Sequence, residues 1–307
     1  MKDEILKKSY LNAFDIKDKY IKDMLIVITK SLMDDSKQRC VKIDDNRLRD
    51  ELIYYKFYGE KINDLNIINI LLPIIISNTN IQRSEDEVLK TIKNYTLYNK
   101  KEEYLSEYIL GSLIYNTLIH SIIDNKNIEY NDLMQNIKTR IIEFIPNLEK
   151  SKVIKFEMCR IKTIQAIDKN IDLYKNEYSD NDIILNLLNV IYDVYIEDRE
   201  VDIDGVNSMK KSILSILDFE LNTNIDNIDF IRSMSEYIIK LRKYKINKKA
   251  YSIKSDPRYL IGLEVGDTKQ DPILNNIKVI SKNFVNNVLK IKVISKSGNY
   301  DFKFIKS

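Results

Sequence analysis

Along most of the chain, apolar residues recur at intervals of three and four positions. This spacing places them on one face of a helix. Between Met24 and Met33 the pattern predicts an amphipathic helix that ends at Asp34-Asp35. The same period predicts further helices over residues 44–58, 65–77, 84–95, 105–122, 130–145, 148–174, 180–196, 206–217 and 226–244.

Polar residues mark where some of these helices begin and end. Asp44-Asp45 supplies an N-cap for the helix over 44–58, and Gly59 supplies a stop. Ser84 is followed three positions later by Glu87, which is the spacing of a capping box. We therefore expect a helix to begin at Ser84.

Near residue 250 the period changes from helical spacing to strict alternation, which is typical of strands. Leu289, Ile291 and Val293 alternate with lysines, and Phe302 and Phe304 alternate in the same way. Turn residues separate the runs, at Ser297-Gly298-Asn299 and at Asn286-Asn287. Ahead of the second turn, an earlier strand is indicated by Ile277, Val279 and Phe284.

The predicted fold class is mainly α, with a multi-helix globular body and a small C-terminal antiparallel β meander. We expect an all-helical domain over residues 1–248 and a small β-rich appendage of three strands over residues 249–307. A sheet this small needs its apolar face covered, so it should pack on the helical body. Its solvent face then carries Lys290, Lys292, Lys303 and Lys306.

Composition narrows the classes of protein that are possible. Of 307 residues, 44% are hydrophobic and 31% are charged, which is a globular balance. A net charge of +3 is too small to indicate nucleic-acid binding by itself, and six glycines argue against Gly-rich phosphate loops. The first residues are charged, and the longest apolar stretch is about half a membrane span. We expect no membrane span and a cytoplasmic location.

The chain has few residues that could carry catalysis. A catalytic triad would have to use His120, the single histidine. Cys40 and Cys159 are too far apart to match a zinc motif and are interpreted as small buried hydrophobes. We therefore assign no catalytic, cofactor-binding or metal-binding residues, and we expect no cofactor.

One stretch mixes basic and aromatic residues in a way that could contact nucleic acid. It could stack bases and neutralise phosphates. The alternative is a solvated helix end, where cations favour the C-terminal dipole. The residues of this candidate patch are Lys240, Arg242, Lys243, Tyr244, Lys248 and Lys249.

Three segments follow one another in an order that resembles a known enzyme family. They are the apolar run Met24–Leu32, the segment Asp44–Tyr58 with an acidic start and an aromatic end, and the apolar segment Ile68–Ile75 with Pro73 inside it. Over about residues 17–135 this order is similar to that of the ADP-ribosylglycohydrolase family. The resemblance implies a helical body.

The departures from that family lie at its metal ligands. Lys19-Tyr20-Ile21-Lys22 stands where the family has the Thr-Asp-Asp-Thr motif that holds magnesium. Lysines at those positions repel cations. The segment Gly266–Asp271 matches the family's second metal motif only in part, and it is interpreted as a surface turn. The resemblance therefore implies a pseudoenzyme.

The leading functional hypothesis is a non-catalytic helical scaffold or protein-interaction module with an unidentified protein partner. One alternative is an active magnesium-dependent ADP-ribosyl hydrolase with displaced ligands, for which the candidates are Asp34, Asp35, Asp44 and Asp45. A second alternative is a nucleic-acid-binding helical protein that uses the patch over residues 240–249.

Overall fold

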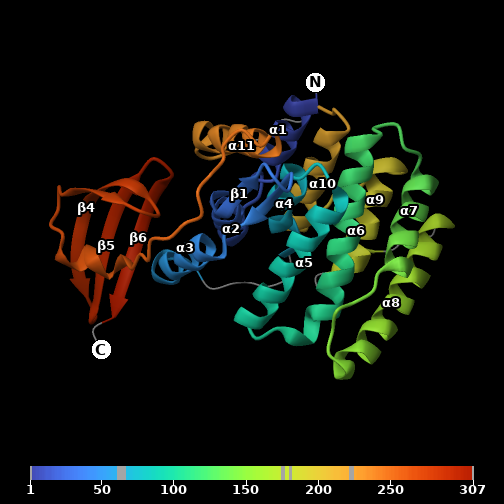
Figure 1. Cartoon of the computed structure of the whole chain (residues 1–307), viewed down its shortest axis with the longest axis horizontal. Coiled ribbons are helices and arrows are strands. Elements are labelled where there is room, and N and C mark those ends of the chain that lie inside the picture. Colours follow the sequence, from blue (N-terminus) through green and yellow to red (C-terminus); the bar gives the residue numbers. More distant parts are fainter. Residues whose placement is uncertain (1, 61–66, 174–176, 180–181, 221–224, 306–307) are drawn as a thin grey trace.

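The helical body is built around α6 (Leu105–Asp124), most of whose residues are buried. In the computed structural model, which describes residues 2–60, 67–173, 177–179, 182–220 and 225–305, α6 lies among other helices (Figure 1). One of these contacts is close at Gly111, where a Cβ would lie only 3.1 Å from the Ile183 side chain. Packed around α6 are α5 (Ile81–Tyr98), α7 (Tyr130–Glu143), α8 (Lys150–Ile171), α9 (Ile183–Tyr195), η1 (Ile67–Leu71) and α4 (Leu72–Ser77).

The remaining helices form a second part of the body, toward the sheet. They are α1 (Lys2–Asn12), α2 (Lys19–Ser31), α3 (Asp45–Tyr58), α10 (Asp204–Ile216) and α11 (Ile228–Arg242). Helix α1 packs on both α10 and α11, while α2 packs on α3, η1 and α4. Short 3-10 helices complete the set, η2 (Glu102–Tyr104) and η3 (Pro257–Gly262). None of the helices in the described part of the chain combines the length and apolar content that crossing a bilayer requires.

The expectation of an all-helical domain over residues 1–248 is wrong at one place. Helix α2 ends at Ser31, and β1 (Leu32–Asp35) pairs antiparallel with β2 (Cys40–Ile43). Leu32, Val41 and Ile43 are buried, so the hairpin contributes to the core. Strand β1 directly follows α2 and continues its apolar run. The helical spacing of the sequence therefore did not separate the strand from the helix.

Two helix beginnings also differ from expectation. Helix α5 begins at Ile81, and its N-cap is Asn80, whose side chain accepts a hydrogen bond from the Arg83 N–H. Ser84 lies inside the helix and donates to Asn116. The capping-box interpretation is therefore wrong. The buried helix expected over 65–77 is split into η1 and α4, and residues 65 and 66 lie outside the described residues.

The C-terminal sheet is antiparallel and has four strands, which confirms the fold class but corrects the strand number. The order is β3 (Thr268–Asp271), β4 (Asn275–Val285), β5 (Val288–Ser295) and β6 (Gly298–Ile305). Strand β3 falls in the segment that was expected to be a surface turn. A bulge in β4 between Val279 and Ser281 places Phe284 on the same face as Ile277, although their sequence spacing is odd.

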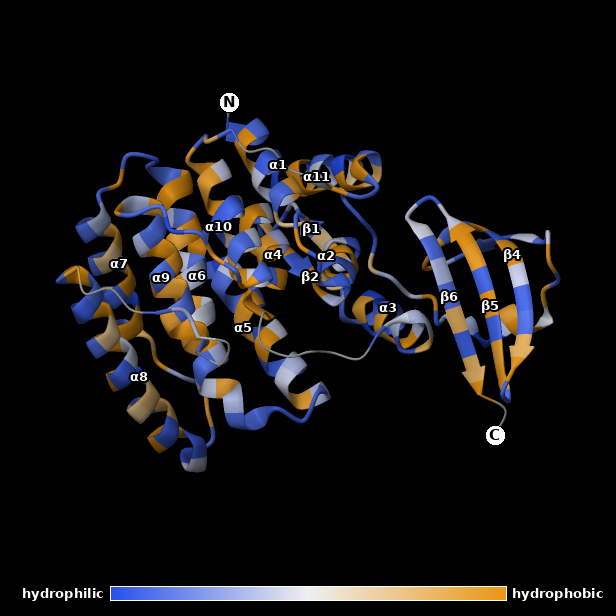
Figure 2. Cartoon of the chain, turned by 180° about the vertical axis from the view of Figure 1, so that it is seen from behind, coloured by the Kyte–Doolittle hydropathy of each residue, from blue (hydrophilic) through white to orange (hydrophobic). Residues whose placement is uncertain are grey.

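The apolar face of the sheet packs on α3, as expected for a sheet that covers its own core. Phe302 makes edge contacts with Tyr54 and Tyr58, and Phe304 lies 5.2 Å from Phe57 between ring centroids. Figure 1 shows α3 between the sheet and the other helices, and Figure 2 shows apolar and polar residues alternating along β5 and β6. Lys290, Lys292 and Lys303 lie on the opposite face, while Lys306 lies outside the described residues.

The linker before the sheet is held by buried carboxylates. Asp34 accepts hydrogen bonds from the backbone N–H groups of Ile246, Asn247 and Lys248, at 2.9, 2.9 and 3.1 Å. Asp50 accepts one from Ser255 at 2.8 Å. The domain division at residues 248 and 249 stays a prediction, but this linker is bonded to the body along its length.

Replacing Phe302 by Ala should destabilise the protein by about 3–5 kcal/mol, because the side chain is fully buried between α3 and the sheet. Phe284→Ala is the matched control, since Phe284 is in the same sheet but 60% exposed. It should change the free energy of unfolding by less than about 0.5 kcal/mol. Urea denaturation measures both, and equal effects would show that the sheet does not depend on α3.

Candidate functional site

An apolar cleft of about 650 Å³ lies between α2, α3 and α5. Helix α3 lines it along one whole face. The α3 residues recur at helical spacing, from Asp45 through Leu48 and Leu52 to Lys56. Fourteen residues of α-helix measure roughly 20 Å, so the cleft is a long groove. We call it the α3 cleft.

The floor of the α3 cleft comes from α2 and η1. It consists of Tyr20, Met24, Ile28 and Ile70, all of which are buried. The Tyr20 ring makes an edge contact with Tyr55 at 6.0 Å, and its hydroxyl interacts with that of Tyr95 on α5. Burial raises the pKa of Tyr20 far above its usual range. The floor is therefore a neutral, aromatic surface.

Charged groups lie at the rim and not on the floor. Asp45 pairs with Lys90 at 2.7 Å and joins α3 to α5, and Glu60 lies 3.9 Å from Lys19. Arg49 and Lys56 are exposed on α3. The two ion pairs lie near opposite ends of α3, so they frame the groove and leave its middle apolar.

Burial raises the pKa of Asp23, on α2 beside the α3 cleft, to about 6. Its Oδ2 has no hydrogen-bond partner among the described residues. Within the same ranges, no three His, Cys, Asp or Glu side chains are grouped closely enough to hold a metal ion. An apolar floor with a few rim charges is suited to binding apolar or aromatic groups.

The candidate patch over residues 240–249 is divided between solvent and the protein interior. Arg242 is 9% exposed and donates to the carbonyl groups of Ile76, at 2.8 Å, and Asn78. Lys248 donates to the carbonyls of Lys30 and Leu32, and burial lowers its pKa to about 8.

Among the other patch residues, Tyr244 donates to the Arg39 carbonyl, and Lys243 pairs with Asp3. Lys240 and Lys249 are exposed. Four of the six patch residues therefore fasten α11 and the linker to the body.

The four carboxylates considered for a hydrolase each have a structural partner. Asp44 caps α3 and also accepts from the Tyr251 N–H at 2.5 Å. Asp34 holds the linker, and Asp45 pairs with Lys90. Asp35 accepts from the N–H groups in its own hairpin turn and from Lys42. These contacts indicate that the four carboxylates cap a helix, hold turns and the linker, or form an ion pair, and they do not favour a catalytic role.

Lys19, Tyr20 and Lys22, which the suggested resemblance aligns with a metal motif, have contacts of other kinds in the structure. Lys22 lies 3.4 Å from Asp226, Lys19 lies near Glu60, and Tyr20 is in the floor of the α3 cleft. Cys40 is buried and Cys159 is half-buried, and burial raises the pKa of Cys159 to about 11.

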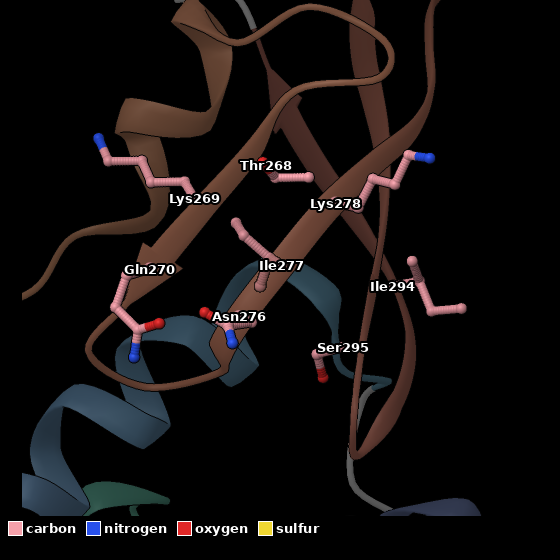
Figure 3. Close-up of a pocket in the computed structure, with 8 residues that line it drawn as sticks. All are labelled: Thr268, Lys269, Gln270, Asn276, Ile277, Lys278, Ile294 and Ser295. Carbon is pink, nitrogen blue, oxygen red and sulfur yellow. The ribbon is translucent and has the colours of Figure 1, made fainter.

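A second hollow, of about 480 Å³, lies on the outer face of β3, β4 and β5. It is lined by polar residues such as Thr268, Gln270 and Asn276, with Ile294 beside them (Figure 3). The amino groups of Lys269 and Lys278 point away from one another in Figure 3. The hollow therefore brings no set of charges together around one point.

His120 is a core residue. It is 2% exposed, and burial, followed by the nearby charge of Arg242, lowers its pKa to about 4. Its Nε2 has no hydrogen-bond partner among the described residues. This burial favours a structural role for His120 in the core over a catalytic one.

Comparisons of the chain with protein-family models, with curated proteins and with solved structures found no match. The α3 cleft was missed by sequence reasoning because its residues come from four separate segments, α2, α3, η1 and α5. Each segment alone has only the apolar period of a core helix. The signal that was available was the excess of tyrosines in Tyr54–Tyr58 and at Tyr95 and Tyr98.

The low pKa of His120 predicts a pH dependence of stability. The pKa in the unfolded chain is about 6.5, so between about pH 4 and 6.5 the unfolded state binds more protons and stability falls as the pH falls. From about pH 7.5 to pH 5 the wild type should lose about 2 kcal/mol more than His120→Leu.

Urea denaturation of both proteins at the two pH values measures this difference. The raised pKa of Asp23 acts with the opposite sign, but it is present in both proteins and cancels. Parallel pH profiles for wild type and variant would contradict a buried, neutral His120.

Proposed function

We propose that this protein is a non-catalytic binding module whose α3 cleft takes the apolar side chains of a partner protein. The observation that supports this most strongly is the groove itself, with its apolar and aromatic floor and its charged rim. Large aromatic residues in a concave site are typical of positions that contribute most to protein binding. The resemblance to the ADP-ribosylglycohydrolase family stays a prediction.

A protein segment fits the shape of the site better than a compact ligand does. The groove follows α3 for roughly 20 Å, which is the length of three to four helical turns. An amphipathic helix binds such a groove through apolar residues at positions i, i+3 or i+4, and i+7. The rim offers both signs of charge, Arg49 and Lys56 beside Asp45 and Glu60, which would orient the segment.

Selection from a displayed library of helical peptides tests the proposal. Enriched peptides should carry apolar residues at helical spacing. Their affinity should fall at least about tenfold with Leu52→Trp, which fills the groove, and with Asn94→Trp, which obstructs its exposed rim. Leu97→Trp is the matched control, because Leu97 is on α5, 66% exposed and outside the groove lining, and it should leave binding unchanged.

Two results would contradict the proposal. One is that the selected peptides bind all three variants equally well, which would place their site elsewhere. The other is a rise in melting temperature with ADP-ribose that requires magnesium. A ligand at a hundred times its dissociation constant adds about 2.7 kcal/mol to native-state stability, so thermal denaturation would detect it. That result would favour the hydrolase alternative.

A further inference from the structure

A row of aliphatic side chains lies at one end of the sheet, where β4 turns into β5 and where β6 ends. Val285, Val288 and Ile305 are register partners across β4, β5 and β6, on the face opposite the core. Val285 is 47% exposed and Ile305 is 79% exposed. On the other face of β4, next to Val285 in the chain, Phe284 is 60% exposed. Four apolar side chains thus gather at one extremity; we call them the sheet tip.

The next row on the same face is basic. Asn283, Lys290 and Lys303 are register partners, so two lysines stand directly opposite each other on neighbouring strands. Like charges in this position destabilise a sheet. Among the residues that the structure describes, neither of these two lysines forms an ion pair, whereas Lys292, one row further, lies 3.9 Å from Asp301. The outer face therefore carries a band of positive charge immediately behind an apolar end.

The position and rigidity of the sheet tip suit contact with a flat surface. The sheet stands at one end of the molecule (Figures 1 and 2), and its register places the end of β6 at Ile305 beside the β4–β5 turn. The β4–β5 turn is tight, with Asn286 and Asn287 at φ values of 49° and 61°. A two-residue turn of this kind fixes the hairpin, so little conformational entropy is lost when its end is bound.

We propose that the sheet tip is a peripheral membrane-binding site for anionic lipid bilayers. Phe284, Val285 and Ile305 enter the boundary between headgroups and acyl chains, while Lys290 and Lys303 lie at the level of the anionic headgroups. Apolar burial and attraction to anionic lipid together give stable but reversible attachment. This inference is independent of the function proposed for the α3 cleft.

The arrangement favours a bilayer over a nucleic acid. A strand of nucleic acid would place bases on aromatic rings interleaved with the lysines. Here the apolar groups lie at the extremity instead, beyond the lysines, and most of them are aliphatic. An anionic bilayer, with an apolar interior behind a charged layer, complements both rows at once.

Sedimentation of the full chain with lipid vesicles tests the proposal. The protein should bind vesicles of phosphatidylcholine with phosphatidylserine and bind phosphatidylcholine alone much more weakly. Each basic residue near such a surface contributes about fivefold, so Lys290→Gln with Lys303→Gln should lower the partition coefficient about 30-fold. Phe284→Ser with Ile305→Ser should abolish binding to both kinds of vesicle. All four side chains are exposed, so the melting temperature should not change.

Two double variants elsewhere serve as matched controls. Lys240→Gln with Lys249→Gln removes the same charge from exposed positions outside the sheet, and Ile154→Ser with Met158→Ser removes exposed apolar side chains from α8. Both should bind as the wild type does. The proposal is overturned if the wild type ignores phosphatidylserine, if a control variant loses as much binding as its tip counterpart, or if the tip lysines are needed for a single-stranded oligonucleotide but not for vesicles.

Discussion

Glu51 is a buried carboxylate on α3, and the groups that neutralise it join the two parts of the molecule. Its oxygens accept from Lys30 on α2 at 2.6 Å and from Arg47 at 2.7 Å. The same guanidinium donates to the carbonyls of Pro272 and Ile273, between β3 and β4. A buried charge without its partners is strongly destabilising, so α2, α3 and the sheet must keep their relative positions for Glu51 to remain paired.

A second buried carboxylate, Asp271, continues this junction on the sheet side. It accepts from the hydroxyls of Tyr54 and Tyr259, both at 2.6 Å, and from the N–H groups of Ile273 and Leu274. Helix α3 is thus used on three sides: one packs on aromatic residues of β6, one binds the linker, and one lines the α3 cleft. The cleft floor and the sheet are held by one helix, so both proposed binding sites depend on the same junction.

The sequence predicted the helices and strands that have a regular apolar period. It failed for features that are determined by contacts between residues far apart in the chain. The helical period located α9, α10 and α11, and alternation located β5 and β6, because each has a full apolar face. The hairpin of β1 and β2 is too short for a period to develop. Ser84 matched a capping box, yet Asn80 begins the helix and Ser84 is used by Asn116. The prediction of an exposed basic patch was partly wrong for the same reason. Only the fold shows that Arg242 donates to the carbonyls of Ile76 and Asn78.

Hydrogen exchange measured in the native state tests most directly whether this junction makes one cooperative unit of the body and the sheet. The comparison is between the amides of Ile291 and Val293 in the centre of the sheet and those of Leu113 and Ile114 in α6. If α3 couples the two parts, both sets should exchange only through global unfolding, with the same free energy of opening and the same dependence on denaturant. Exchange of the sheet amides through a separate opening of lower free energy, while α6 stays protected, would contradict the account.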